Sequence, residues 1–161
     1  KDESFTTVIS ISSIEHIKEV EKVFDEAFRV LKPDGKFIFT VHTIEVERLF
    51  FLPFARDFFI RLYSQVFKHE INLEREEWVR LAQEAGFEVL KVEGTISKMQ
   101  ILIFQFLLIT ALPSQIFRLL FKKRMFLVHP LRAKIIYSLF KWVLNDTKKT
   151  DANIMIVARK N

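Results

Sequence analysis

Residues 5–41 read FTTVISISSIEHIKEVEKVFDEAFRVLKPDGKFIFTV, and they predict the fold more directly than any other part of the chain. Residues 5–11 are rich in β-branched side chains, which is typical of a strand covered on both faces. Apolar residues then recur at helical spacing over residues 14–31. Residues 32–35, Lys-Pro-Asp-Gly, predict a turn, and residues 36–41 predict a second strand. A strand, a helix and a strand of these lengths predict a right-handed βαβ unit.

One helix and two more strands are expected further along the chain. Residues 72–85 predict a helix that ends at Gly86, which stands in the position of a left-handed cap. Residues 87–92 (FEVLKV) and residues 153–160 (NIMIVARK) predict the third and fourth strands. The predicted class is therefore α/β, with residues 97–150 inserted as a helical segment before the last strand.

The insertion, residues 97–150, combines positive charge with apolar bulk. It contains ten Lys or Arg residues and one acid, Asp146, whereas the rest of the chain carries 15 basic and 19 acidic residues. Its longest apolar run, residues 101–112, is shorter than the ~20 residues that a membrane-spanning helix needs. This composition suits a membrane surface or an acidic partner. Binding to nucleic acid is not expected, because the chain lacks the signatures of the common nucleic-acid-binding modules.

Cysteine and histidine content excludes several kinds of site. The chain has no Cys, which excludes disulfides, thiolate zinc sites, iron–sulfur clusters and a Cys nucleophile. Its four His residues show no ligand spacing, so no metal site is expected. The sequence begins with Lys1 and shows no signal-peptide pattern, so we expect a cytoplasmic protein whose natural start lies upstream. Peripheral association with a membrane, through the insertion, is left open.

Three motifs follow one another in order. They are residues 2–17 (DESFTTVISISSIEHI), residues 28–36 (FRVLKPDGK) and residues 84–87 (EAGF). Together they resemble class I S-adenosylmethionine-dependent methyltransferases of the type 11 kind, from the middle of that domain into its fifth and sixth strands. The resemblance covers residues 1–96, and residues 153–160 match the family's last strand.

The resemblance implies that residues 1–161 are the C-terminal part of one methyltransferase domain with a Rossmann-like sheet. It implies the last four of seven strands, the final strand being antiparallel and inserted between the fifth and the sixth. It also implies S-adenosylmethionine as the cofactor. The family's glycine-rich loop and its ribose-binding acid are not found, since Gly occurs only at positions 35, 86 and 94. Thr6 and Thr7 stand where the family usually has Asp.

Candidate site residues follow the first two predicted strands, because ligands of open α/β sheets bind beyond the carboxyl ends of the strands. The resemblance places the cofactor at Ile11, Ser12, Ser13 and His16, and the substrate at His42 and Thr43. Histidine titrates near neutral pH, so His42 is able to accept a proton from a hydroxyl substrate. The alternative for His42 is a partly exposed residue at a strand end. No catalytic residue is assigned.

Ser12 and Glu15 also have a purely structural explanation. Their spacing is that of a capping box at the start of a helix, in which each side chain bonds to the backbone of the other residue. This alternative would leave neither side chain for a ligand, and the sequence does not decide between the two.

Three classes of function remain. The leading one is methyl transfer from S-adenosylmethionine to a small molecule. Six Phe residues within residues 50–67 favour a core or a lid, and a lid would suit an apolar or lipid-linked acceptor. The alternative is a truncated, non-catalytic module that binds a membrane surface or a protein partner. A nucleotide-dependent oxidoreductase is disfavoured, because the steps Glu15-His16 and Lys32-Pro33-Asp34-Gly35 resemble those of methyltransferases. The methylated atom and the oligomeric state are not predicted.

Overall fold

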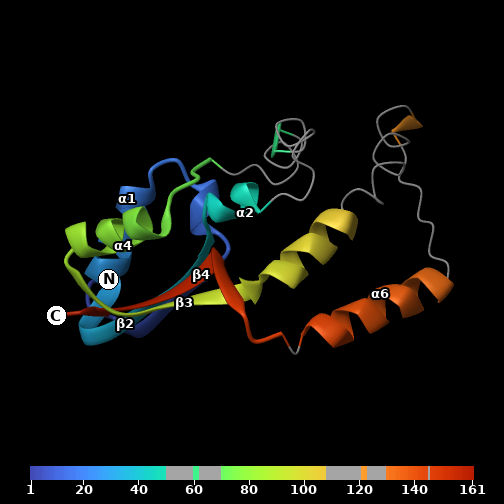
Figure 1. Cartoon of the computed structure of the whole chain (residues 1–161). Helices are drawn as coiled ribbons and strands as arrows, with labels where there is room; N and C mark the ends of the chain where they lie inside the picture. Colours follow the sequence, from blue (N-terminus) through green and yellow to red (C-terminus); the bar gives the residue numbers. More distant parts are fainter. Residues whose placement is uncertain (50–59, 62–69, 108–120, 123–129, 145) are drawn as a thin grey trace.

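The computed structural model describes residues 1–49, 60–61, 70–107, 121–122, 130–144 and 146–161 (Figure 1). The elements along the chain are β1 (Phe5–Ile11), a 3-10 turn η1 (Ile14–His16), α1 (Val20–Val30), β2 (Leu31–His42), α2 (Glu45–Arg48), α4 (Arg75–Glu84), β3 (Phe87–Ser97), a helix at residues 98–107, α6 (Pro130–Val143) and β4 (Lys149–Lys160). The six Phe residues of the expected lid, together with His69 and His129, lie outside the described residues.

The four strands form one sheet in the order β1-β2-β4-β3. β1 and β2 are parallel, whereas β4 is antiparallel to both of its neighbours. The last strand in the sequence therefore lies between the two strands that precede it, as the resemblance implied. The predicted α/β class and the partial Rossmann-like sheet with an antiparallel final strand are confirmed.

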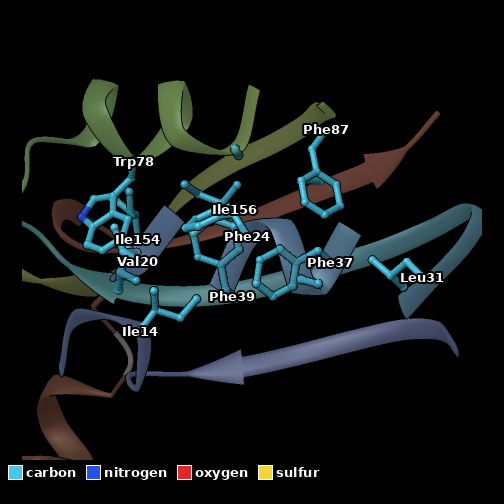
Figure 2. Packing of buried hydrophobic residues seen from close by; sticks show 14 residues of the cluster. Ile14, Val20, Phe24, Leu31, Phe37, Phe39, Trp78, Phe87, Ile154 and Ile156 are labelled. Carbon is cyan, nitrogen blue, oxygen red and sulfur yellow. The ribbon is translucent and has the colours of Figure 1, made fainter. Parts of the chain in front are cut away.

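The core lies between the sheet and the two helices α1 and α4 (Figure 2). Phe37 and Phe39 are two positions apart in β2, so both side chains point to the same face of the sheet. The ring of Phe24 from α1 meets both of them edge-on, with ring centroids 5.6 and 5.2 Å away. Each such buried side chain stabilises the fold by about 1.5–3 kcal/mol. Trp78 of α4 is completely buried, and its Nε1 donates a hydrogen bond of 3.2 Å to the carbonyl oxygen of His42. The core therefore fixes the carboxyl end of β2.

The first predicted helix is wrong in its first turn. Residues 14–31 were expected to form one helix, but Ile14–His16 form a 3-10 turn and α1 begins only at Val20. The capping box is also wrong. Ser12 has a positive φ of 44°, and its N–H donates to the backbone oxygen of Thr40 at 3.0 Å. Glu15 is turned toward the interior and is 1% exposed.

The strand β1 is not covered on both faces as expected, since Phe5, Ile9 and Ile11 are exposed. The remaining predicted elements are correct in kind and differ at their ends. Residues 32–35 form a bulge inside β2 instead of a turn before it. Phe5 of β1 pairs with Leu31 and Thr7 pairs with Lys36, so β2 has extra residues between these two pairs. β3 continues to Ser97 and β4 begins at Lys149, so both strands are longer than predicted. The helix α4 starts at Arg75, and Gly86 has a φ of +92°, which confirms the left-handed cap.

The insertion contains the helix at residues 98–107 and α6 among its described parts (Figure 1). The first of these helices follows β3 directly. Within the described ranges, no helix has both the length and the apolar character needed to cross a bilayer.

Candidate functional site

The carboxyl ends of β1 and β2 bring the two groups of predicted site residues together. β1 and β2 are parallel neighbours with Ile11 opposite Thr40, so residues 11–16 lie beside the end of β2. Glu15 Oε1 lies 3.1 Å from Nδ1 of His42, although the two residues are 27 positions apart in the sequence. The site therefore contains a carboxylate–imidazole pair that spacing alone did not reveal.

Glu15 is held deep in the protein. Its backbone oxygen accepts hydrogen bonds from the N–H groups of Glu70 and Ile71, at 3.0 and 3.2 Å. These bonds anchor the turn η1 to the segment before α4. Its second carboxylate oxygen, Oε2, is buried and has no hydrogen-bond partner among the residues that the structure describes.

The carboxyl group of Glu15 is stabilised in its charged form. Burial is the largest influence and by itself raises the pKa of Glu15. Hydrogen bonds from His42 and from the backbone of Glu15, together with the charges of His42 and His16, outweigh it, and the net pKa lies below the ordinary value of 4.5. Glu15 is therefore a carboxylate at neutral pH, and it acts as a hydrogen-bond acceptor for the imidazole.

His42 borders an apolar cavity of about 300 Å³. Its side chain is 28% exposed, so the ring joins the buried carboxylate to the accessible space. Residues from β2, α2, β3 and the helix at residues 98–107, together with the residue after α6, line the cavity. The described residues that line it are His42, Val46, Ile96, Gln100, Ile101, Phe104 and Leu144. Such a space suits a small molecule with an apolar body.

Thr43 is almost completely buried at the end of β2. It is 3% exposed, its Oγ1 donates a hydrogen bond of 2.6 Å to the backbone oxygen of Asp151, and it accepts one from the N–H of Glu45. The hydroxyl therefore joins the end of β2 to β4 and to the start of α2.

A second cavity of about 340 Å³ borders Thr43. In it, Arg75 pairs with Asp151 at 2.9 Å and Arg48 pairs with Glu74 at 2.6 Å. Its arginines are thus already paired with carboxylates.

The four predicted cofactor residues lie on the surface beside the carboxyl end of β1. Ile11 is 69% exposed, Ser13 and His16 are also exposed, and Ser12 is half-buried. Ser13 Oγ donates a hydrogen bond of 2.8 Å to the backbone oxygen of Ile11. The segment thus presents one large apolar side chain next to polar groups. In the described ranges, no group of three or more His, Cys, Asp or Glu residues is placed to hold a metal ion.

Comparison with known proteins supports the resemblance. Residues 1–39 match the family model of the methyltransferase domain. No curated protein sequence matches the chain. Among solved structures, Haemonchus contortus phosphoethanolamine N-methyltransferase 2 is 20% identical with a TM-score of 0.56, and the match covers 99% of this chain and 34% of that protein.

Two other solved structures show how widely this fold is used. The [4+2]-cyclase SpnF is 18% identical with a TM-score of 0.54, over 99% of this chain and 50% of that one. An S-adenosylmethionine-dependent methyltransferase of Thermotoga maritima is 18% identical with a TM-score of 0.53, over 100% of this chain and 58% of that one. The chain thus has the fold of part of a class I methyltransferase domain, and it spans between a third and three fifths of these relatives.

Proposed function

We propose that this chain is the C-terminal part of an S-adenosylmethionine-dependent methyltransferase that acts on a small molecule with an apolar body. The observation that carries the proposal is the apolar cavity beside the Glu15–His42 pair, at the carboxyl end of β2. Ligands of open α/β sheets bind at this edge. The match of residues 1–39 to the methyltransferase domain supports the assignment of the reaction.

The exposed surface of Ile11, Ser13 and His16 fits one wall of a site for S-adenosylmethionine. Ile11 offers an apolar contact for a flat ring, and the neighbouring serines and histidine offer polar groups. The sulfonium centre of the bound cofactor supplies an activated methyl group. The chain itself contains no glycine-rich loop for the other end of the cofactor. We therefore expect a complete site to need further residues.

The contribution of this chain to catalysis is then mainly one of placement. The cavity would exclude water from the acceptor and hold the acceptor's reacting atom beside His42, at the edge where Ile11 to His16 face the cofactor. Holding reacting groups in line supplies a large part of the rate of a methyl transfer. A base is needed only where the acceptor must lose a proton.

The test is binding of S-adenosylhomocysteine by the full protein expressed from its gene, measured by titration calorimetry, followed by transfer of labelled methyl groups to small apolar acceptors. We expect binding, and we expect substitution His42→Ala to reduce transfer while leaving binding of S-adenosylhomocysteine within about twofold. A folded full protein that does not bind S-adenosylhomocysteine would refute the proposal. The alternative, a module without catalysis, would then be favoured.

We also propose that the insertion rests on the surface of an anionic membrane. In the helix at residues 98–107, Ile101 and Gln105 are buried, each 3% exposed. The opposite side of the same helix carries Met99, Leu102, Ile103 and Phe106, at the spacing of one helical face. Met99 and Phe106 are 37% and 53% exposed. This helix therefore turns an apolar stripe outward, as an interfacial helix does.

The described part of α6 adds positive charge to the insertion. Lys134, Tyr137 and Lys141 follow one another at helical spacing and are exposed, Tyr137 at 68%. Lysines beside a tyrosine match the layer of lipid headgroups, where the aromatic ring and the charges are both satisfied. Anionic lipid is thus the partner that fits both the charge and the apolar stripe.

Flotation of the full protein with vesicles tests this second proposal. We expect binding to vesicles that contain phosphatidylserine, weaker binding to pure phosphatidylcholine, and loss of the difference at high salt. Equal binding to both kinds of vesicle, unaffected by salt, would contradict the proposed electrostatic attraction between the insertion and anionic lipid. The double substitution Met99→Gln and Phe106→Gln is expected to reduce binding at least tenfold, whereas Leu90→Gln, at an exposed apolar position of β3 outside the insertion, serves as the matched control.

A further inference from the structure

The starting point is the cost of burying Glu15. A carboxylate that is 1% exposed loses nearly all its hydration, which is unfavourable unless partners compensate for it. The structure gives it the ring of His42 at 3.1 Å and leaves Oε2 without a hydrogen bond in the described part of the chain. Apolar side chains in such places are often at least as stabilising as a buried ion pair. A buried, incompletely compensated carboxylate at the ligand edge of a sheet is therefore a candidate for a functional role.

The geometry also determines what the pair is able to do. An ionised carboxylate only accepts hydrogen bonds, so Nδ1 of His42 carries the hydrogen that lies between them. The neutral imidazole then has its lone pair on Nε2, on the far side of the ring. A proton gained there creates a positive charge next to the Glu15 carboxylate, in surroundings of low dielectric constant. The pair is thus arranged to accept a proton.

The cavity lining limits which acceptors can use such a pair. Among the described residues that line it, His42 is the only titratable one, and Gln100 is the only other polar side chain. The described lining offers no carboxylate to pair with an ammonium group, and a desolvated, unpaired ammonium is strongly unfavourable. A neutral molecule is therefore favoured. A neutral hydroxyl group is an acceptor that must lose a proton when it is methylated.

We propose that Glu15 and His42 form a proton-accepting pair for the O-methylation of a neutral, apolar hydroxyl compound. In this step the acceptor oxygen bonds to the methyl carbon, the bond from that carbon to the sulfonium sulfur breaks, and its electron pair stays on sulfur. The hydroxyl proton passes to Nε2 of His42. Glu15 is a positioning residue, since it touches the imidazole and holds its tautomer. The inference rests on the proposed methyltransferase function.

The first test needs no variant. Histidine 15N NMR of the full protein at about pH 8, where a histidine of ordinary pKa is neutral, reports which ring nitrogen carries the hydrogen. We expect His42 to carry it on Nδ1, and the substitution Glu15→Gln to abolish this preference. The matched control is Glu21→Gln, which changes an exposed carboxylate of α1 and is expected to leave the tautomer as it is. A hydrogen on Nε2 in the unaltered protein would overturn the inference.

The second test addresses the class of acceptor, with two probes of similar shape. We expect 4-propylphenol to bind and to shift the His42 ring signals, and 4-propylbenzylamine, which is cationic at neutral pH, to bind at least tenfold more weakly. Equal or tighter binding of the amine, or no binding of the phenol, would overturn the proposed acceptor class. Methyl transfer to an amine would likewise overturn it while leaving the proposed function intact. Absence of S-adenosylhomocysteine binding would instead refute the proposed function itself.

The third test separates positioning from folding. With an acceptor that is turned over, Glu15→Gln is expected to lower kcat at least tenfold with little change in KM, because the substituted amide no longer favours the correct tautomer. Glu15→Asp keeps the negative charge and is expected to recover part of kcat. An unchanged kcat in a folded Glu15→Gln variant would show that Glu15 has no positioning role.

Discussion

Lys160, next to the last residue of the chain, donates a hydrogen bond of 2.9 Å from its Nζ to the carbonyl oxygen of Leu31, at the start of β2. The same Nζ lies 4.7 Å from the centre of the Phe28 ring and 3.4 Å from a carboxylate oxygen of Glu3. Lys160 is 8% exposed. The end of β4 is thereby joined to α1 and to the bulged start of β2, and one ammonium group satisfies a backbone oxygen that no water reaches easily.

We expect Lys160→Met to lower the free energy of unfolding by about 1–3 kcal/mol. Methionine keeps the apolar part of the side chain, but it leaves the carbonyl oxygen of Leu31 without its donor and removes the cation from the Phe28 ring. Urea denaturation measures the change. Lys91→Met, at an exposed position of β3, is the control and is expected to stay within about 0.5 kcal/mol. Equal effects of the two substitutions would contradict this account of Lys160.

Gly86 ends α4 with a φ of +92°, which L side chains rarely adopt. A Cβ at this position would also lie 3.1 Å from the ring of Phe28. We therefore expect Gly86→Ala to lower the free energy of unfolding by more than about 1 kcal/mol. Thermal denaturation followed by circular dichroism measures it. Glu84→Ala, at an exposed position of the same helix, should change it by less than about 0.5 kcal/mol; a neutral Gly86→Ala would refute the strain argument.

Much of the fold was predictable, because its signals are local. The β-branched run at residues 5–11, the apolar periodicity of α1 and the glycine at position 86 each depend on a few neighbouring residues. The order of the strands followed from the family resemblance. The ends of β3 and β4 were predicted too short, since pairing between the two strands extends them beyond their apolar runs.

The candidate site was only partly predictable, because its main interaction is not local. Ser12 and Glu15 have the spacing of a capping box, yet Glu15 bonds to a histidine 27 positions away. A local pattern cannot reveal that competing partner. The cavity is another case, since Phe104 and Leu144 meet His42 only after the insertion has folded back beside β2. A signal was present nonetheless: a lone acid between Ile14 and Ile17, directly after a strand.

The contribution of the Glu15–His42 pair to the free energy of unfolding should depend on pH in the acidic range. The folded state holds the pKa of Glu15 below its ordinary value, so its stabilising effect is complete above the ordinary carboxyl range and is lost as the pH falls through the folded-state pKa. We expect Glu15→Gln to lower the free energy of unfolding at neutral pH by about 1–3 kcal/mol. The difference from the unaltered protein should shrink below about pH 4. Urea denaturation over a pH series measures it, and a difference independent of pH would contradict the predicted linkage.

Ser13 offers the sharpest probe of the cofactor wall. It is exposed, and its φ of −132° accepts any side chain, whereas Ser12 has a φ of 44° at which a bulky residue would be strained. We expect Ser13→Leu to weaken binding of S-adenosylhomocysteine by the full protein at least tenfold, because the larger side chain occupies the space beside Ile11. The free energy of unfolding should change by less than about 1 kcal/mol.

Gln83→Leu is the matched control for this substitution. It adds the same side chain at an exposed position of α4, outside the segment from Ile11 to His16, so both the affinity for S-adenosylhomocysteine and the fold should be retained. Calorimetric titration of the two variants side by side gives the comparison. If a folded Ser13→Leu protein binds S-adenosylhomocysteine as tightly as Gln83→Leu, then the segment from Ile11 to His16 does not face the cofactor. The cofactor wall would then have to be sought at another strand end.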